Sequence, residues 1–258
     1  MTQSRNKYSK ILVTGANGHI GFNLVKTLHE EGHEGGSTDV NRVGKVVLTS
    51  SIVTLPTVKP GAPLADQTSW RTDLSVPYMR AKTEAEKFAW KLAEEKNTNL
   101  ATVLTCVIIG PNFGGGTPTT DMIQVMKMGS MRMGTIDNIY QILDVREVVT
   151  AHILAAKKDV TGNFIVGADN EPVFVEVLDA MRRIDPKVPK AMMIVPKLFY
   201  PKLPAFDWLS NKMMGTPRTM TRELIESIGD TNMLANNQKA KDEFGWSQNV
   251  DLETSLRE

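Results

Sequence analysis

A tyrosine and a lysine stand four residues apart in a segment with helical spacing. On a helix, Tyr78 and Lys82 project from the same face. A free phenol has a pKa of about 10, which is too high for easy proton exchange at neutral pH. A neighbouring ammonium group stabilises the phenolate and lowers this pKa, and a hydroxyl from another element could then hold a substrate carbonyl. The pair indicates proton transfer at a tyrosine, although many helices carry this spacing as a plain solvated pair.

A glycine-rich segment near the start of the chain has the spacing G-x-x-G-x-x-G. Its glycines are Gly15, Gly18 and Gly21, after the apolar run Lys10–Thr14 and before a segment of helical spacing. Glycines let a backbone turn sharply and approach a pyrophosphate, whose charge is met by N–H groups at a helix N-terminus. A plain strand-to-helix turn is the alternative, but the strand and helix around the loop favour a dinucleotide-binding site.

Strands and helices alternate along the chain. We predict strands at 10–14, 45–51, 100–109, 139–143 and 163–167, and helices at 22–31, 77–95, 122–128, 144 onward, 173–184 and 233–244. Asp144 caps its helix, with Glu147 three residues on as in a capping box. Residues 54–76 are expected to form a loop and 186–220 irregular short helices. This order predicts an α/β fold with a parallel sheet covered on both faces.

Composition narrows the classes of function. The 258 residues include 30 basic and 29 acidic side chains, interspersed, so neither nucleic acid nor an anionic membrane is expected as a partner. The single cysteine, Cys106, makes no internal disulfide, and no signal core or apolar run of spanning length is present. The four histidines do not cluster with carboxylates at ligand spacing, so no metal site is expected. These features favour a cytoplasmic enzyme or binding protein.

Several stretches together resemble the extended short-chain dehydrogenase/reductase superfamily, in particular its dihydroflavonol-reductase-like branch, which is related to the NAD-dependent epimerases and dehydratases. They are Lys10–Gly21, Val46–Ser51, Asp66–Trp70, Pro77–Trp90, Ile108–Pro111, Asp144–Val149 with Ala151 and His152, and Lys239–Trp246. The resemblance implies a Rossmann-type doubly wound parallel sheet with a smaller C-terminal substrate lobe. We divide the chain into a dinucleotide-binding domain, 1–168, and a mainly substrate-binding lobe, 169–258, interleaved with the core.

The resemblance also implies roles for individual residues. Tyr78 would donate a proton to the carbonyl, and Lys82 would bind the nicotinamide ribose and lower the pKa of the tyrosine. Ser51 would hydrogen-bond the substrate oxygen, with Ser50 as the second choice. The cofactor, NADP or NAD with NADPH favoured, would deliver hydride. Cofactor-binding positions would be Gly15, Asn17, Gly18, His19, Ile20, Gly21, Tyr78 and Lys82.

The chain departs from this pattern between residues 34 and 46. Only Gly35–Gly44 lies where two or three βα units, roughly 60–90 residues, would be expected. The lost part would include the residue that selects NAD or NADP. Either the deletion is genuine, or the sequence omits a segment of a longer protein, which we favour. A smaller departure is Leu104–Cys106, where the branch has an Asn-Pro-Gly-like turn, so no side-chain role is assigned there.

The region beyond residue 120 is rich in methionine, with five of the 14 between Met122 and Met133. Methionine suits an adaptable apolar pocket but also serves as core filler. The segment 191–209 could be a membrane-surface segment, but its three prolines argue against a continuous amphipathic helix. Arg146 and His152 are assigned to a structural helix.

These observations predict an NAD(P)-dependent oxidoreductase that reduces an apolar aldehyde or ketone to an alcohol. The alternatives are a nucleotide-sugar epimerase or dehydratase, and a non-catalytic cofactor-binding protein if the deletion is genuine. A homodimer is compatible with the sequence. The substrate, the choice between NAD and NADP, and the oligomeric state are not determined at this level.

Overall fold

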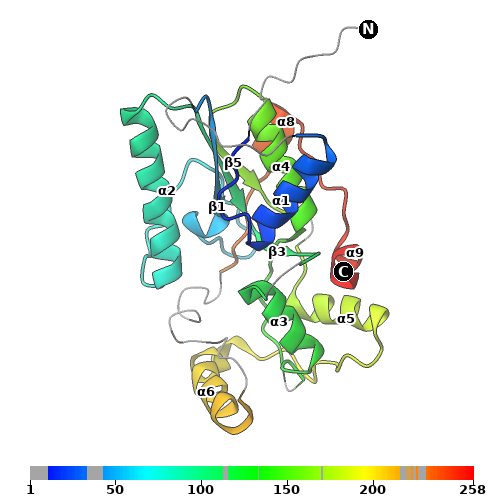
Figure 1. Ribbon diagram of the computed structural model, residues 1–258. Coiled ribbons are helices and arrows are strands. Elements are labelled where there is room, and N and C mark those ends of the chain that lie inside the picture. Colours follow the sequence, from blue (N-terminus) through cyan, green and yellow to red (C-terminus); the bar gives the residue numbers. More distant parts are fainter. Residues whose placement is uncertain are drawn as a thin grey trace.

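A three-stranded parallel sheet forms the centre of the larger of the two parts of the molecule, the upper one in Figure 1. The computed structural model describes residues 11–33, 43–112, 116–132, 134–169, 171–215, 220, 222, 225 and 231–258. The strands β1 (Val46–Ser51), β2 (Leu100–Thr105) and β5 (Gly162–Val166) lie in the order β1-β2-β5 (Figure 1). Ser51 is paired with Thr105 and Thr105 with Val166, so the carboxyl ends of all three strands lie at one edge.

Helices cover both faces of this sheet. Helix α2 (Pro77–Glu95) packs on one face against β1 and β2, and α4 (Val145–Lys157) packs on the other (Figure 1). Helix α1 (His19–Glu30) lies against α4. Helices on both faces of a parallel sheet define the doubly wound arrangement, which confirms the predicted fold class.

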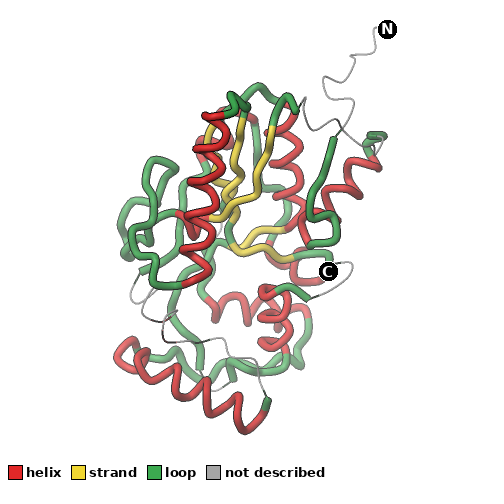
Figure 2. The backbone as a smooth tube through the Cα atoms, turned by 60° about the vertical axis from the view of Figure 1, so that its left-hand side comes forward, coloured by secondary structure: helices red, strands yellow, loops and turns green. Residues whose placement is uncertain are grey.

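The predicted strand 100–109 is divided in two. Strand β2 ends at Thr105, and after Cys106 the strand β3 (Val107–Ile109) pairs in parallel with β4 (Ile142–Asp144) in a separate sheet. Figure 2 shows this short pair below the main sheet. The chain therefore leaves the main sheet at Cys106 and enters the lower lobe, which holds α3 (Pro118–Lys127), α5 (Phe174–Ile184) and α9 (Leu252–Arg257).

Two hydrophobic clusters correspond to these two parts. One surrounds the main sheet and includes Val103, Phe164 and, from the C-terminal region, Trp246. The other fills the lobe and includes Met126 and Met181. Residues from both sides of position 168 enter each cluster. The boundary at residue 168 itself stays a prediction.

Some predicted elements differ from the structure. Ile11–Val13, the described part of the predicted first strand, does not form a strand. The helix expected at 233–244 is confined to α8 (Gln238–Phe244), because residues 232, 233 and 235 form isolated bridges. The expected gap falls mainly on residues 34–42, which lie outside the described residues.

The segment 186–220 is more regular than expected. After a 3-10 helix, η3 (Lys197–Lys202), the chain forms the 12-residue helix α6 (Leu203–Met214). Pro204 falls in the first turn of α6, where a missing N–H costs no intrahelical hydrogen bond. Within the described residues, no helix is both long and apolar enough to cross a membrane.

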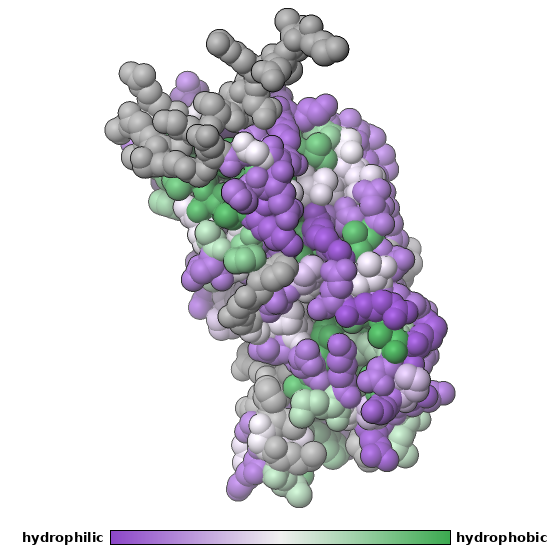
Figure 3. Space-filling model, turned by 45° about the vertical axis from the view of Figure 1, so that its right-hand side comes forward, coloured by the Kyte–Doolittle hydropathy of each residue, from purple (hydrophilic) through white to green (hydrophobic). Residues whose placement is uncertain are grey.

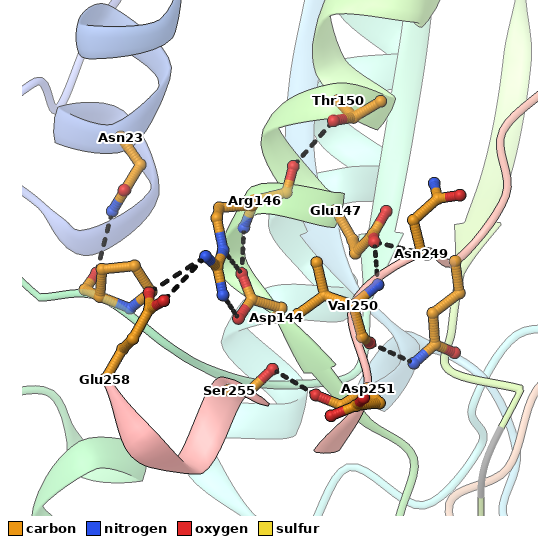
Figure 4. A network of polar contacts seen from close by, with 12 residues as sticks. Asn23, Asp144, Arg146, Glu147, Thr150, Asn249, Val250, Asp251, Ser255 and Glu258 are labelled. Atoms are coloured by element: carbon orange, nitrogen blue, oxygen red, sulfur yellow. Dashed lines mark hydrogen bonds and ion pairs between the residues drawn. The ribbon is translucent and has the colours of Figure 1, made fainter. Parts of the chain in front are cut away.

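A polar network fixes the start of α4 to the end of the chain (Figure 4). The buried Asp144 accepts the Arg146 N–H at 2.8 Å as the N-cap, and its carboxylate also pairs with the Arg146 guanidinium. Glu147 does not complete the predicted capping box. Its carboxylate instead accepts the backbone N–H groups of Asn249 and Val250, at 2.6 and 2.7 Å. Asp144, through Arg146, and Glu147 thus attach the C-terminal segment to α4.

Candidate active site

The glycine-rich loop is closed on itself at the start of α1. Gly15 has a left-handed φ of 68°, and the Gly18 N–H donates to the Gly15 carbonyl at 2.9 Å. A Cβ at Gly21 would lie 2.1 Å from that same carbonyl oxygen, so the turn requires glycine there. In this described part of the chain, no side chain caps α1 and no acidic residue lies in its first turn. The backbone therefore fits an anionic pyrophosphate at this helix N-terminus.

Two side chains of α1 hold the loop beside the end of β3. The His19 Nε2 atom lies 2.9 Å from the Pro111 carbonyl, and the Asn23 amide donates to that carbonyl at 3.1 Å. Asn17 is exposed, and Ile20 packs against the cluster around the main sheet. The side chain of His19 thus anchors the helix, and its role in cofactor binding stays a prediction.

Ser51 ends β1 at the carboxyl edge of the sheet. Its hydroxyl donates to the Thr105 carbonyl at 3.3 Å and accepts the Val53 N–H at 3.4 Å. It also lies near the phenol of Tyr78 in the first turn of α2, and this contact lowers the pKa of that phenol. The structure thus brings together a serine and a tyrosine from two elements that the sequence alone could not place relative to each other.

Tyr78 is accessible from solvent and protonated at neutral pH. Its side chain is 57% exposed, and the Lys82 Nζ atom lies 6.0 Å from the centre of its ring. Desolvation raises the pKa of Tyr78 above its usual value of 10.0, and the contact with Ser51 partly offsets this. Lys82 is not among the groups that shift the pKa of Tyr78, so its expected effect on the phenol stays a prediction.

Glu86 is a buried residue next to the site that the sequence analysis did not single out. Its carboxylate, only 1% exposed, accepts hydrogen bonds from Ser50 on β1, Thr102 on β2 and Asn163 on β5. Helix α2 is thereby tied to all three strands of the sheet. Since Glu86 is one turn from Lys82, the helical spacing was the signal that could have revealed it.

This network separates the two serines. The hydroxyl of Ser50 is engaged by Glu86, whereas the hydroxyl of Ser51 faces Tyr78. The loop before α2 packs against the same helix, because the Lys87 ammonium lies 5.2 Å from the Trp70 ring centre. No group of three or more His, Cys, Asp or Glu side chains among the described residues is arranged to hold a metal ion.

The comparisons with known proteins agree with this geometry. The model of the NAD dependent epimerase/dehydratase family matches residues 37–167. The chain is 31% identical over 159 residues to anthocyanidin reductase from Vitis vinifera, a match that covers 53% of this chain and 46% of that protein. It is 28% identical over 113 residues to tetraketide alpha-pyrone reductase 2 from Arabidopsis thaliana, covering 43% and 35%. The chain thus spans about half the length, or less, of these curated relatives.

Solved structures share the fold across nearly the whole chain. The crystal structure of gox2253 matches with a TM-score of 0.77 at 18% identity, covering 97% of this chain and 96% of that one. A Thermus thermophilus UDP-glucose 4-epimerase in complex with NAD matches with a TM-score of 0.68 at 15% identity, covering 96% of each chain. At these identities the likeness shows the fold alone, a Rossmann-type α/β fold.

Fold, motifs and family model therefore define a Rossmann-fold protein of the extended short-chain dehydrogenase/reductase type. The chain belongs to the NAD dependent epimerase/dehydratase family. This confirms the resemblance drawn from the sequence. The roles of individual site residues stay predictions.

Proposed function

We propose that this protein is an NAD(P)H-dependent reductase that converts an aldehyde or ketone to an alcohol. The proposal rests on the approach of the Ser51 hydroxyl to the Tyr78 phenol at the carboxyl edge of the sheet, with the Lys82 ammonium close by. The reductases among the curated relatives support this direction of reaction.

Each of the three side chains has a distinct task in this reaction. Ser51 orients the substrate carbonyl by donating a hydrogen bond to its oxygen. Tyr78 then gives its phenolic proton to that oxygen, and its raised pKa keeps the phenol protonated and ready to donate at neutral pH. Lys82 lies close enough to stabilise the phenolate that remains.

The glycine loop and the first turn of α1 would hold the cofactor. Gly15, Gly18 and Gly21 give the backbone the close approach that a pyrophosphate requires. When bound, the nicotinamide supplies the hydride. NADP and NAD both remain candidates, with NADPH favoured, and the substrate is proposed to be a small apolar carbonyl compound.

The test is consumption of NADPH and NADH with a panel of aryl and aliphatic aldehydes and ketones. Tyr78→Phe should lower kcat about a hundredfold or more, because the proton donor is lost. Tyr140→Phe is the matched control, because Tyr140 stacks on Phe174 in the lobe and phenylalanine preserves that contact. No turnover with any carbonyl, or full activity of Tyr78→Phe, would reject the reductase function.

Nucleotide-sugar epimerisation is the second candidate, favoured by the family and by the fold of UDP-glucose 4-epimerases. An epimerase regenerates its cofactor and consumes no NAD(P)H. Incubation with UDP-sugars, with the products separated by chromatography, distinguishes the two reactions. Cofactor binding without either reaction would indicate a non-catalytic binding protein.

A further inference from the structure

Helix α6 has its apolar side turned outward. Phe206, Leu209 and Met213 recur at the spacing of one helical face and are 66%, 44% and 74% exposed. Asp207 and Asn211, on another side of the helix, are half-buried, and each already takes part in a polar interaction. An ordinary surface helix has the reverse orientation, with its apolar face toward the core.

The exposed apolar surface extends from α6 onto η3. Leu198 and Phe199 of η3 are 83% and 45% exposed. We call these side chains, with Phe206, Leu209 and Met213, the α6 face. In Figures 1 and 2, α6 forms the end of the lobe farthest from the main sheet. By contrast, the side of the molecule in Figure 3 is mostly hydrophilic, with hydrophobic residues in scattered patches. Large apolar side chains exposed together on one segment indicate an interaction site.

Basic side chains accompany the apolar ones along η3 and α6. Residues 186–214 contain five lysines and one acidic residue, Asp207, in a chain whose net charge is only +1. The Nζ atoms of Lys202 and Lys212 lie 5.6 and 5.2 Å from the ring centres of Phe199 and Trp208. Aromatic and basic side chains thus occur side by side, as on surfaces that enter the boundary between lipid headgroups and acyl chains.

The same charges disfavour a second copy of the chain as the occupant. A two-fold symmetric contact would place the α6 face of one copy against that of the other. Lysines would then meet lysines, while Asp207, the acidic residue of the segment, lies on another side of the helix. Like charges brought together at an interface oppose association. An anionic surface has the complementary charge.

We propose that the α6 face binds the surface of an anionic membrane. Phe206, Leu209, Met213 and Leu198 would enter the interface between headgroups and acyl chains, and the lysines would contact anionic headgroups. Binding would be peripheral. The three prolines that seemed to exclude a membrane-surface helix lie in and before the first turn of α6, so the helix beyond them is continuous.

Sedimentation of the whole protein with lipid vesicles tests this. We expect binding to vesicles of phosphatidylcholine mixed with phosphatidylserine, much weaker binding to pure phosphatidylcholine, and loss of binding at high salt. Phe206→Ser with Met213→Ser should weaken binding about tenfold or more. Replacing Lys197, Lys202 and Lys212 by Gln should weaken binding to the mixed vesicles by about fivefold per lysine.

Helix α2 provides matched controls. The side chain of Phe88 is 65% exposed, nearly the same fraction as that of Phe206. Phe88→Ser should therefore leave vesicle binding unchanged. Lys91→Gln removes an exposed charge from the same helix and should have no effect either. Circular dichroism and thermal unfolding establish that each variant is folded. Vesicle sedimentation does not depend on enzymatic activity, so its outcome is separate from that of the proposed reductase function.

Two results would overturn the proposal. One is no vesicle binding, or binding that the α6 variants leave unchanged. The other is a dimer, seen by sedimentation velocity, that dissociates in the Phe206→Ser, Met213→Ser variant without any vesicle binding, which would assign the α6 face to a second copy.

Discussion

The Tyr78 phenol lies beside the Ser51 hydroxyl, so the first turn of α2 meets the end of β1 at one point. The neighbouring Ser50 hydroxyl donates to Glu86 two turns further along the same helix. Adjacent serines thus have different partners on α2. Ser51 lies beside Tyr78, and Ser50 contributes to the attachment of the helix to the sheet.

The two serines should therefore respond differently to substitution. Ser51→Ala should lower kcat about a hundredfold, because a hydrogen-bond donor to the substrate oxygen is lost. It should also raise the pKa of Tyr78 further, since the contact with Ser51 lowers it. Ser50→Ala should mainly reduce stability, by about 1 kcal/mol. Steady-state kinetics, tyrosinate absorbance against a Tyr78→Phe reference, and urea unfolding measure the three effects. If Ser50→Ala lost more activity than Ser51→Ala, Ser50 and not Ser51 would be the serine that contacts the substrate.

Glu86 should stabilise the protein through its three hydrogen bonds. Glu86→Ala removes the buried acceptor of Ser50, Thr102 and Asn163 and should lower the free energy of unfolding by about 2 kcal/mol or more. Glu86→Gln keeps the volume of the side chain, and it should lower the free energy of unfolding by less than Glu86→Ala does. The control Glu84→Gln, at an exposed position of the same helix, should stay within about 0.5 kcal/mol of the wild type. Equal midpoints of chemical unfolding for Glu86→Ala and Glu84→Gln would contradict this role.

Gly21 should be essential for the glycine loop. In Gly21→Ala the new methyl group would meet the Gly15 carbonyl, so the turn must open and the N–H groups of α1 must shift. We expect at least about tenfold weaker NADPH binding, measured by fluorescence titration. Gly44→Ala is the control, since a Cβ there meets no atom within 4 Å. Unchanged affinity in a folded Gly21→Ala protein would place the pyrophosphate elsewhere.

His152 should make stability depend on pH below neutrality. Its Nδ1 atom lies 2.8 Å from the Val148 carbonyl and its Nε2 atom 2.7 Å from the Thr49 hydroxyl, and burial lowers its pKa from 6.5. Because the unfolded chain then binds the proton more readily, stability is full above pH 6.5 and is lost as pH falls toward the lower pKa of the folded state. The slope from this one group cannot exceed about 1.4 kcal/mol per pH unit, the limit for one proton.

Chemical unfolding between pH 7 and pH 5 measures this slope. The His152→Gln variant should be less stable at pH 7 and should show a flatter profile over that range. Asp144 adds to the pH dependence of stability only at lower pH, because its pKa lies below the usual 3.8. A wild-type profile as flat as that of the variant would show that another group carries the dependence.

Local pattern was sufficient for several elements. The spacing of apolar residues predicted α2 at 77–95, and the structure has Pro77–Glu95, because Pro77 starts the helix and its inward face is continuous. The apolar runs predicted β1 and β5 within one residue at each end. The parallel doubly wound class followed from the alternation of strands and helices.

Pairing between distant segments decided the rest. Ile11–Val13 has strand-forming residues but does not form a strand, because a strand requires a neighbour for its hydrogen bonds and no described segment pairs with it. The apolar run 100–109 is one segment in sequence, yet its two halves pair with different strands.

For the site, the sequence by itself determined that Tyr78 and Lys82 share a helix face and that a glycine loop opens α1. Only the tertiary structure decided that Ser51 contacts Tyr78 whereas Ser50 contacts Glu86. Spacing along one helix is a property of neighbouring residues. The partner of a side chain at a strand end depends instead on how the helix packs on the sheet, and here the three donors to Glu86 come from three different strands.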